Sequence, residues 1–333
     1  MTQKRKVKIG VVGCGVVATA YYFPYLMNMD DVELVAVCDL EPKRTEGCSK
    51  LFGVKEQYQD YFDMLKKADI EAVFILTAPG THKKFAIAAA EAGKHILLQK
   101  PMAITVEDAK EIVAAVRKAN VKALIEPSDH TLLHPHYRTL RKLITEGVLG
   151  LPYWFMYAGT AGESYSAMLG GNPYGNAAFF SKDSGGMLFD FPYAPTQIAT
   201  LLGSCKSVMG MANTAVPDRM IVPDQGYTEF LQNAADPQNV NYWDKVMDVP
   251  RTERIEMASE DNVFSLYEMV EGWTGVFHVG RPFHPMPKGI NEGGLKIFGS
   301  EGNLVMDMNG KLASLISTRK DLLPQTDERG WYY

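Results

Sequence analysis

A glycine-rich stretch near the start of the chain constrains its fold more than any other feature. The run from Val7 to Val12 is apolar and rich in β-branched residues, which is typical of a buried strand. It leads into a G-x-G-x-x-A pattern, Gly13-Cys14-Gly15-Val16-Val17-Ala18, and residues Thr19 to Met27 can form a helix. Strand, glycine turn and helix in this order predict a loop that binds the pyrophosphate of a dinucleotide.

Each small residue of the pattern has its own expected role. Gly13 permits a tight turn, Gly15 lets a pyrophosphate approach the backbone, and Ala18 lets the helix pack closely on the strand. Val16 and Val17 complete the loop and are predicted to contact the cofactor with the two glycines.

The same residues also look like a secretory signal peptide. Basic residues from Lys4 to Lys6 precede the apolar run, and the small residues Ala18-Thr19-Ala20 follow it. A signal peptide is removed, so the chain after it has no reason to continue its pattern. Here the pattern continues for the next hundred residues, which favours the nucleotide loop.

A second strand carries the next candidate. Leu34 to Cys38 ends at Asp39, about 20 residues after the glycine loop, where dinucleotide-binding folds place the acid that binds the ribose. The alternative is that Asp39 only begins a turn. A carboxylate repels a ribose phosphate, so we expect NAD in preference to NADP, although Lys43 and Arg44 leave NADP open.

Strand and helix patterns then alternate as far as Ile125. The expected strands are Val73 to Thr77, His95 to Leu98 and Val121 to Ile125, and the expected helices are His82 to Ala92 and a capped one from Thr105 through Val116. Such alternation predicts a doubly wound parallel sheet, whose ligands bind beyond the carboxyl ends of the strands. The candidate cofactor contacts after these strands are Thr77, Ala78, Pro79, His82, Gln99 and Lys100.

The second part of the chain has a different character. A helix from His136 to Glu146 is followed by strand-like segments separated by long Gly-, Pro- and Asn-rich connections. The strand-like segments are Tyr153 to Tyr157, Val263 to Glu268, Gly275 to Val279 and Gly294 to Phe298. We therefore expect a Rossmann domain at residues 1–127 and an α+β domain with a mainly antiparallel sheet at 128–333.

Composition excludes several other classes. A chain of 333 residues is long enough for two domains, and its net charge of −5 offers no basic field for nucleic acid. No apolar run approaches the roughly 20 residues that span a bilayer. Four cysteines without metal-type spacing favour reduced thiols. These features predict a cytoplasmic protein without a metal and without a membrane or nucleic-acid partner.

Several motifs together resemble those of the Gfo/Idh/MocA superfamily of oxidoreductases. The matching stretches, in order, are "VVGCGVVA", "TAPGTH", "HILLQKPMA", "DSGGMLFD" and "IFGSEGNLVMD". The resemblance implies an N-terminal Rossmann domain, NAD(P)-dependent chemistry on sugars or related polyols, and a C-terminal open sheet that contacts other copies in a homodimer or homotetramer.

The chain departs from the family pattern at two places. Gln99 stands where the family usually has a glutamate before the lysine, and Ala194 stands where it has a histidine. The catalytic aspartate of the family maps onto Asp190. We expect Tyr193 or the His130, His134 and His136 group to replace the missing imidazole.

Lys100 is the predicted general base. Burial in a closed crevice and a cationic nicotinamide both favour the neutral amine that must accept a hydroxyl proton. The alternative is a solvated lysine before a helix.

Asp190 can bind sugar hydroxyls or only cap the helix expected from Pro192 to Leu202, and Tyr193 can line the site or the core. For His134 we expect a substrate contact, since no supporting ligand suggests a metal.

The sequence is compatible with three functions. The first is an NAD-dependent dehydrogenase that oxidises a ring hydroxyl, at the third carbon by analogy with relatives that act on glycosides. Aromatic residues favour a sugar or glycoside as substrate, and Trp273, His278 and Arg281 are further candidates. The second is a glycosidase that uses bound NAD transiently. The third is a sensor that binds the dinucleotide without turnover.

Overall fold

The computed structural model describes residues 5–15, 17–126, 135–160, 193–215, 217–221, 253–256, 260–280, 293–306 and 313–323. Five of the candidate residues therefore lie outside the described part of the chain: Val16, His130, His134, Asp190 and Arg281. The chain divides into two compact units, and each is described by itself.

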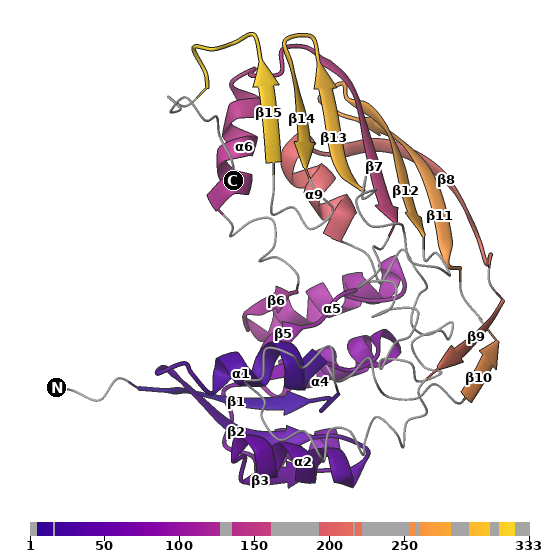
Figure 1. Ribbon diagram of the computed structural model, residues 1–333. Helices are drawn as coiled ribbons and strands as arrows, with labels where there is room; N and C mark the ends of the chain where they lie inside the picture. The colour runs from indigo at the N-terminus through magenta and orange to yellow at the C-terminus, as the bar shows by residue number, and fades with distance from the viewer. Residues whose placement is uncertain are drawn as a thin grey trace. The chain divides into compact units, whose positions relative to one another are not determined.

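The first unit is built on a parallel sheet of six strands (Figure 1). In the order β3-β2-β1-β4-β5-β6 these are Glu56–Tyr58, Val32–Cys38, Val7–Val12, Ala72–Ile75, His95–Leu98 and Ala123–Ile125. Every neighbouring pair is parallel. This is the doubly wound arrangement that the alternating pattern predicts, and β1 lies where the strand order reverses.

Helices cover both faces of this sheet. They are η1 (Ala18–Tyr22), α1 (Phe23–Leu26), α2 (Pro42–Phe52), α3 (Tyr61–Lys67), η2 (Pro79–Thr81), α4 (His82–Glu91) and α5 (Val106–Ala119). Successive residues of a strand point to opposite faces. Ile9 and Val11 accordingly pack with residues of α1 and α2, whereas Val12 packs with residues of α3, α4 and α5.

The first helix differs from the expected continuous helix over Thr19 to Met27. It begins as a π-helix, η1, and continues as α1. The Phe23 N–H donates to the carbonyl of Ala18, five residues earlier, and Pro24 has no N–H to bond the carbonyl four residues before it. The proline thus explains why the α-helical ladder is interrupted here.

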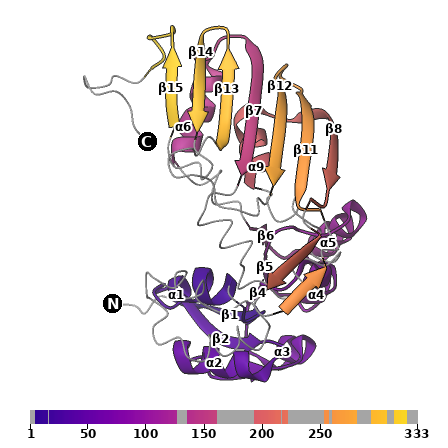
Figure 2. The ribbon, with the colours of Figure 1, turned by 45° about the vertical axis from the view of Figure 1, so that its right-hand side comes forward.

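The second unit contains a seven-stranded sheet, and Figure 2 shows its strands side by side. In the order β15-β14-β13-β7-β12-β11-β8 its strands are Ala313–Ser317, Gly302–Met306, Gly294–Gly299, Pro152–Thr160, Thr274–Gly280, Asn262–Met269 and Cys205–Asn213. Only the β7–β12 pair is parallel, so the prediction of a mainly antiparallel sheet is confirmed. A separate antiparallel pair, β9 (Asp218–Ile221) and β10 (Glu253–Glu256), groups with the first unit.

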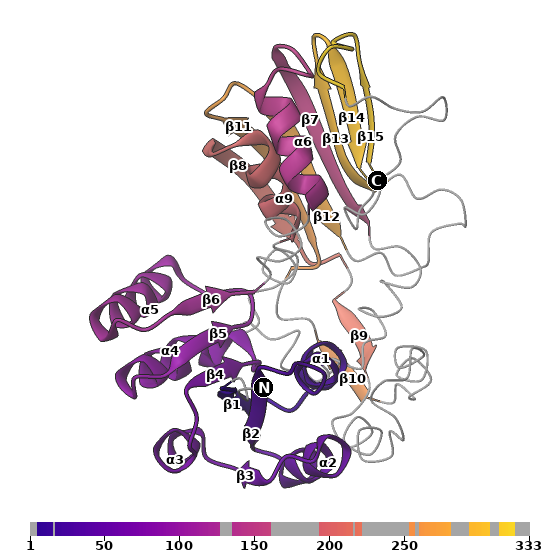
Figure 3. The same cartoon turned by 90° about the vertical axis from the view of Figure 1, so that its left-hand side faces the viewer.

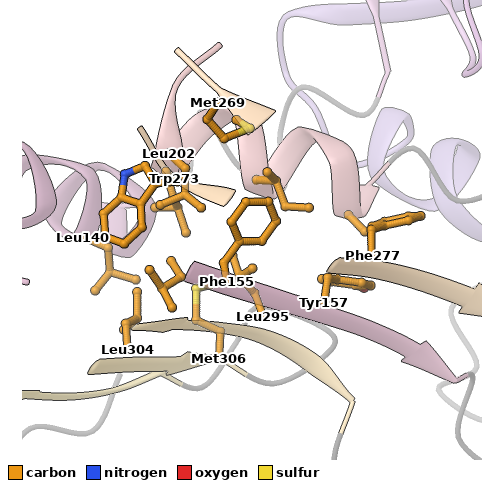
Figure 4. Close-up of a cluster of buried hydrophobic side chains, with 14 of the residues drawn as sticks. Leu140, Phe155, Tyr157, Leu202, Met269, Trp273, Phe277, Leu295, Leu304 and Met306 are labelled. Atoms are coloured by element: carbon orange, nitrogen blue, oxygen red, sulfur yellow. The ribbon is translucent and has the colours of Figure 1, made fainter. Parts of the chain in front are cut away.

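One face of the seven-stranded sheet packs on helices α6 (Pro135–Thr145) and α9 (Tyr193–Leu202), as Figure 3 shows. Phe155, Tyr157 and Phe277 are almost fully buried between them (Figure 4). Side chains of the alternate positions lie on the other face, where Trp154 and Phe298 stack with ring centroids 4.8 Å apart. Met209, Met211 and Leu266 are exposed there. Use of this face in contacts between copies stays a prediction.

In the described part of the chain, none of the helices combines the length and the apolar character that crossing a membrane requires.

The N-cap of α5 allows a test of the capping pattern that the sequence shows at Thr105. The Thr105 side chain accepts a hydrogen bond of 3.1 Å from the Asp108 N–H, as the capping pattern predicts. We expect Thr105→Ala to lower the free energy of unfolding of the first unit by about 1 kcal/mol, and Thr105→Ser to retain it. Urea denaturation followed by circular dichroism measures both. An equal loss in the two variants would show that the hydroxyl contributes no cap.

Candidate functional site

The candidate residues of the first unit gather at the carboxyl edge of its sheet. The glycine loop follows β1, Asp39 follows β2, the Thr77 turn follows β4 and Lys100 follows β5. Because these four strands are parallel neighbours, their carboxyl ends lie along one edge. The loops of β1 and β4 start where the strand order reverses, which is where open α/β sheets bind their ligands.

Gly13 holds the glycine loop between two neighbouring strands. Its N–H donates to the carbonyl of Cys38 at 2.8 Å, and its φ of +93° lies in the region that favours glycine. A Cβ at Gly13 would lie 2.5 Å from the carbonyl oxygen of Leu76. The glycine is therefore required by the close approach of two backbones, in agreement with the expected tight turn.

Gly15 has the opposite environment. Among the residues that the structure describes, and apart from its two chain neighbours, no heavy atom lies within 4 Å of the position that its Cβ would occupy. The backbone at this point is open, which fits the approach of a pyrophosphate. Val17, at the start of the following helix, is partly exposed.

Asp39 joins the loops that follow β1 and β2. One carboxylate oxygen accepts from the Cys14 N–H at 2.8 Å, and the other accepts from the Glu41 N–H at 3.0 Å. The Arg44 guanidinium lies 3.9 Å from the second oxygen, and the carboxylate is only 10% exposed. The turn role is thus present. The carboxylate also orients the glycine loop, a contact that the sequence analysis did not anticipate.

The turn after β4 is held by its own side chains. The hydroxyls of Thr77 and Thr81 are 2.6 Å apart, and Thr81 also donates to the carbonyl of Ala78 at 2.8 Å. Ala78 is exposed, and Thr77 and Pro79 are partly exposed. This turn offers surface to a ligand.

His82 does not offer such a surface. Its side chain is completely buried, and both ring nitrogens face main-chain carbonyls. Burial lowers the pKa of His82 below its ordinary value; hydrogen bonds to the carbonyls of Pro101 and Thr77 oppose this shift, and the charge of Lys100 adds to it. We therefore correct the expected direct cofactor contact, because no atom of this side chain is accessible.

Gln99 and Lys100 are both partly exposed. The Lys100 N–H donates to Oε1 of Gln99 at 2.9 Å, and Nε2 of Gln99 donates to the hydroxyl of Tyr22 at 3.0 Å. The sequence analysis missed Tyr22. No local pattern distinguishes it from other residues of the first helix, because its contact spans the sheet edge.

Two further candidates, Tyr193 and Trp273, belong to the second unit. Tyr193 is the first residue of α9 and is partly exposed. Ala194, which the motif resemblance aligns with the family histidine, is completely buried in the core. Trp273 also belongs to this core.

His278 bonds to Asn262 at 2.9 Å and stacks on Phe264 within the second sheet. Within the described ranges, no three metal-binding side chains form a group that could hold an ion.

Comparison with known proteins agrees with this geometry. Residues 7–126 match the model of an oxidoreductase family with an NAD-binding Rossmann fold. D-apiose dehydrogenase of Paraburkholderia graminis is 27% identical over 191 residues, which are 57% of this chain and 49% of that protein. Inositol 2-dehydrogenase of Salmonella paratyphi B is 29% identical over 146 residues, 44% of this chain and 43% of that protein.

A solved structure resembles nearly the whole chain. Levoglucosan dehydrogenase in complex with NADH and L-sorbose superimposes with a TM-score of 0.71 at 22% identity, covering 95% of this chain and 77% of that chain. The first unit thus has the fold of an NAD-binding Rossmann domain. The match of residues 7–126 to the oxidoreductase family model agrees with the motif resemblance to the Gfo/Idh/MocA superfamily. The matched part spans about half the length of the curated relatives.

The two glycines of the loop predict different effects on stability. Gly13→Ala is expected to lower the free energy of unfolding by about 1–3 kcal/mol, because the new Cβ is strained and meets the Leu76 carbonyl. Gly15→Ala, which points into open space, is expected to unfold at nearly the wild-type denaturant concentration. Equal destabilisation of the two variants would contradict this division of roles.

Proposed function

We propose that this protein oxidises a ring hydroxyl of a sugar or glycoside to a ketone, with NAD as hydride acceptor and Lys100 as general base. One observation carries the proposal. The glycine loop, Asp39 and Lys100 follow three different strands of one parallel sheet and share its carboxyl edge. The names of the relatives support the substrate class, because they are dehydrogenases of apiose, inositol and levoglucosan.

The residues of this edge suit the parts of NAD. Gly13, Gly15, Val16 and Val17 form the loop for the pyrophosphate, and the open backbone at Gly15 supports this assignment. Asp39 would accept hydrogen bonds from the ribose hydroxyls. The partly exposed surface of Thr77, Ala78 and Pro79, together with Gln99 and Lys100, would border the nicotinamide end.

The chemistry divides between cofactor and protein. Bound nicotinamide supplies the site that accepts a hydride. Lys100 takes the proton of the substrate hydroxyl, and its main chain is already oriented by Gln99. Asp190, Tyr193 and His134 are proposed to bind the substrate. Oxidation at the third carbon is part of this proposal.

A dinucleotide sensor without turnover is the second candidate. It is favoured by the buried methyl group of Ala194 at the position of the family histidine, since an imidazole cannot act from that position. Formation of NADH with a sugar or glycoside would exclude a sensor.

Absorbance at 340 nm, measured against a panel of sugars and glycosides, tests the reaction. Lys100→Ala is expected to lower kcat by about 100- to 10,000-fold, because a positioned base is lost. NAD binding, measured by calorimetry, is expected to persist. Lys110→Ala, which removes an exposed lysine of α5, is the matched control and should leave kcat unchanged.

Wild-type turnover in Lys100→Ala would remove Lys100 from the mechanism. Cleavage of a glycoside without net formation of NADH would indicate transient use of NAD.

Asp39 is tested by the ratio of two dissociation constants. Asp39→Ala also removes the bond to the Cys14 N–H, and that damage to the loop affects NAD and NADP alike. Loss of the ribose contact and of the negative charge weakens only NAD and relieves repulsion of the NADP phosphate. We expect the ratio Kd(NAD)/Kd(NADP) to rise by about tenfold or more in Asp39→Ala and in Asp39→Asn. An unchanged ratio would reject the ribose contact.

A further inference from the structure

We propose that His82 is a positioning residue for Lys100, and that it acts by donating a hydrogen bond from Nδ1 to the carbonyl of Pro101. Lys100 takes its role as base from the proposed function, on which this inference rests. All the residues that carry the inference lie in the first unit.

The two ring nitrogens of His82 contact main-chain carbonyls. His82 is the first residue of α4, and its side chain has no exposed surface. A completely buried polar side chain needs hydrogen-bond partners. Its Nδ1 lies 2.7 Å from the carbonyl oxygen of Pro101, and its Nε2 lies 3.0 Å from the carbonyl oxygen of Thr77. The ring therefore bridges the segments that follow β5 and β4.

These contacts complete the support of the Lys100 main chain. On one side, the Lys100 N–H is held by Gln99, which Tyr22 orients in turn. On the other side, the next carbonyl along the chain, that of Pro101, faces His82. A lysine side chain is long and flexible, so the position of its amine depends on how firmly its Cα is held. An error of about 1 Å in the placement of a reacting group can lower a rate by about 100-fold.

The carbonyls of Pro101 and Thr77 each face one ring nitrogen of His82, and the number of ring N–H groups decides which of them accepts a hydrogen bond. A neutral imidazole has a single N–H, and burial favours the neutral form of His82. The contact at Nδ1 is the shorter one, so we assign the proton to this nitrogen. The ring then donates to Pro101, in the segment that carries Lys100, rather than to Thr77.

Two variants separate the two nitrogens. The amide nitrogen of an asparagine lies near the position of Nδ1, and that of a glutamine lies near the position of Nε2. His82→Asn therefore retains the donor toward Pro101, whereas His82→Gln places a donor toward Thr77 and leaves none toward Pro101. We expect kcat to fall by about 10- to 100-fold in His82→Gln and by no more than about threefold in His82→Asn. The Kd for NAD is expected to stay at the wild-type value in both, because His82 touches no cofactor.

Tyr61→Phe is the matched control. The Tyr61 hydroxyl donates to the carbonyl of Phe85 in α4 at 3.0 Å, and its ring is buried. The variant loses one buried hydrogen bond of the same unit without touching the Lys100 segment. We expect its kcat to equal that of the wild type. A kcat in His82→Gln that equals or exceeds that of His82→Asn would overturn the proposal, as would a parallel loss of NAD affinity.

Hydrogen exchange tests the same geometry without turnover. The amide proton of Lys100 is expected to exchange about tenfold faster in His82→Gln than in His82→Asn, because its main chain loses one support. If the wild type forms no NADH with any sugar, the proposed function fails, but this difference in exchange still shows that His82 holds the segment. Equal exchange in an active pair of variants would reject the inference alone.

The wild-type protein offers a measurement that does not depend on any variant folding. In protein labelled with ¹⁵N-histidine, the ring proton of His82 is expected on Nδ1 and protected from solvent. A neutral ring with its proton on Nε2 would overturn the proposal.

Discussion

The first unit depends on a close approach of backbones at Gly13. Its N–H bonds the end of β2, and its missing side chain leaves space for the carbonyl of Leu76 at the end of β4. Three neighbouring strands are thereby joined at the point where the strand order reverses. Any side chain at this position would separate β1 from β4 and widen the edge at which the site lies.

Two polar side chains, one mostly and one completely buried, extend this arrangement along the edge. Asp39 bonds the Cys14 N–H and so orients the glycine loop from the β2 side. His82 bridges the segments after β4 and β5 and so orients the main chain around Lys100. Each is a local element of the fold that also places a group of the proposed reaction. Each side chain has main-chain hydrogen-bond partners, which lowers the cost of taking its polar atoms out of water.

Much of the first unit could be predicted because its signals are local. The strand before Gly13, the helix that begins at His82 and the cap at Thr105 each depend on a few adjacent residues, and each is present. The helix after the glycine loop was less predictable. Pro24 was visible in the sequence, but the π-helical turn it accompanies depends on which carbonyl the Phe23 N–H reaches.

The candidate site was only partly predictable. Sequence alone determined the order of strands and helices and which residues follow the strands, because periodicity and glycine spacing are properties of neighbouring residues. Only the tertiary structure decided that His82 is buried, that Tyr22 bonds Gln99 and that Asp39 bonds Cys14. The residues of the last two contacts are separated by 77 and 25 positions, and no local pattern encodes a hydrogen bond that forms only when two distant segments meet at one edge of a sheet.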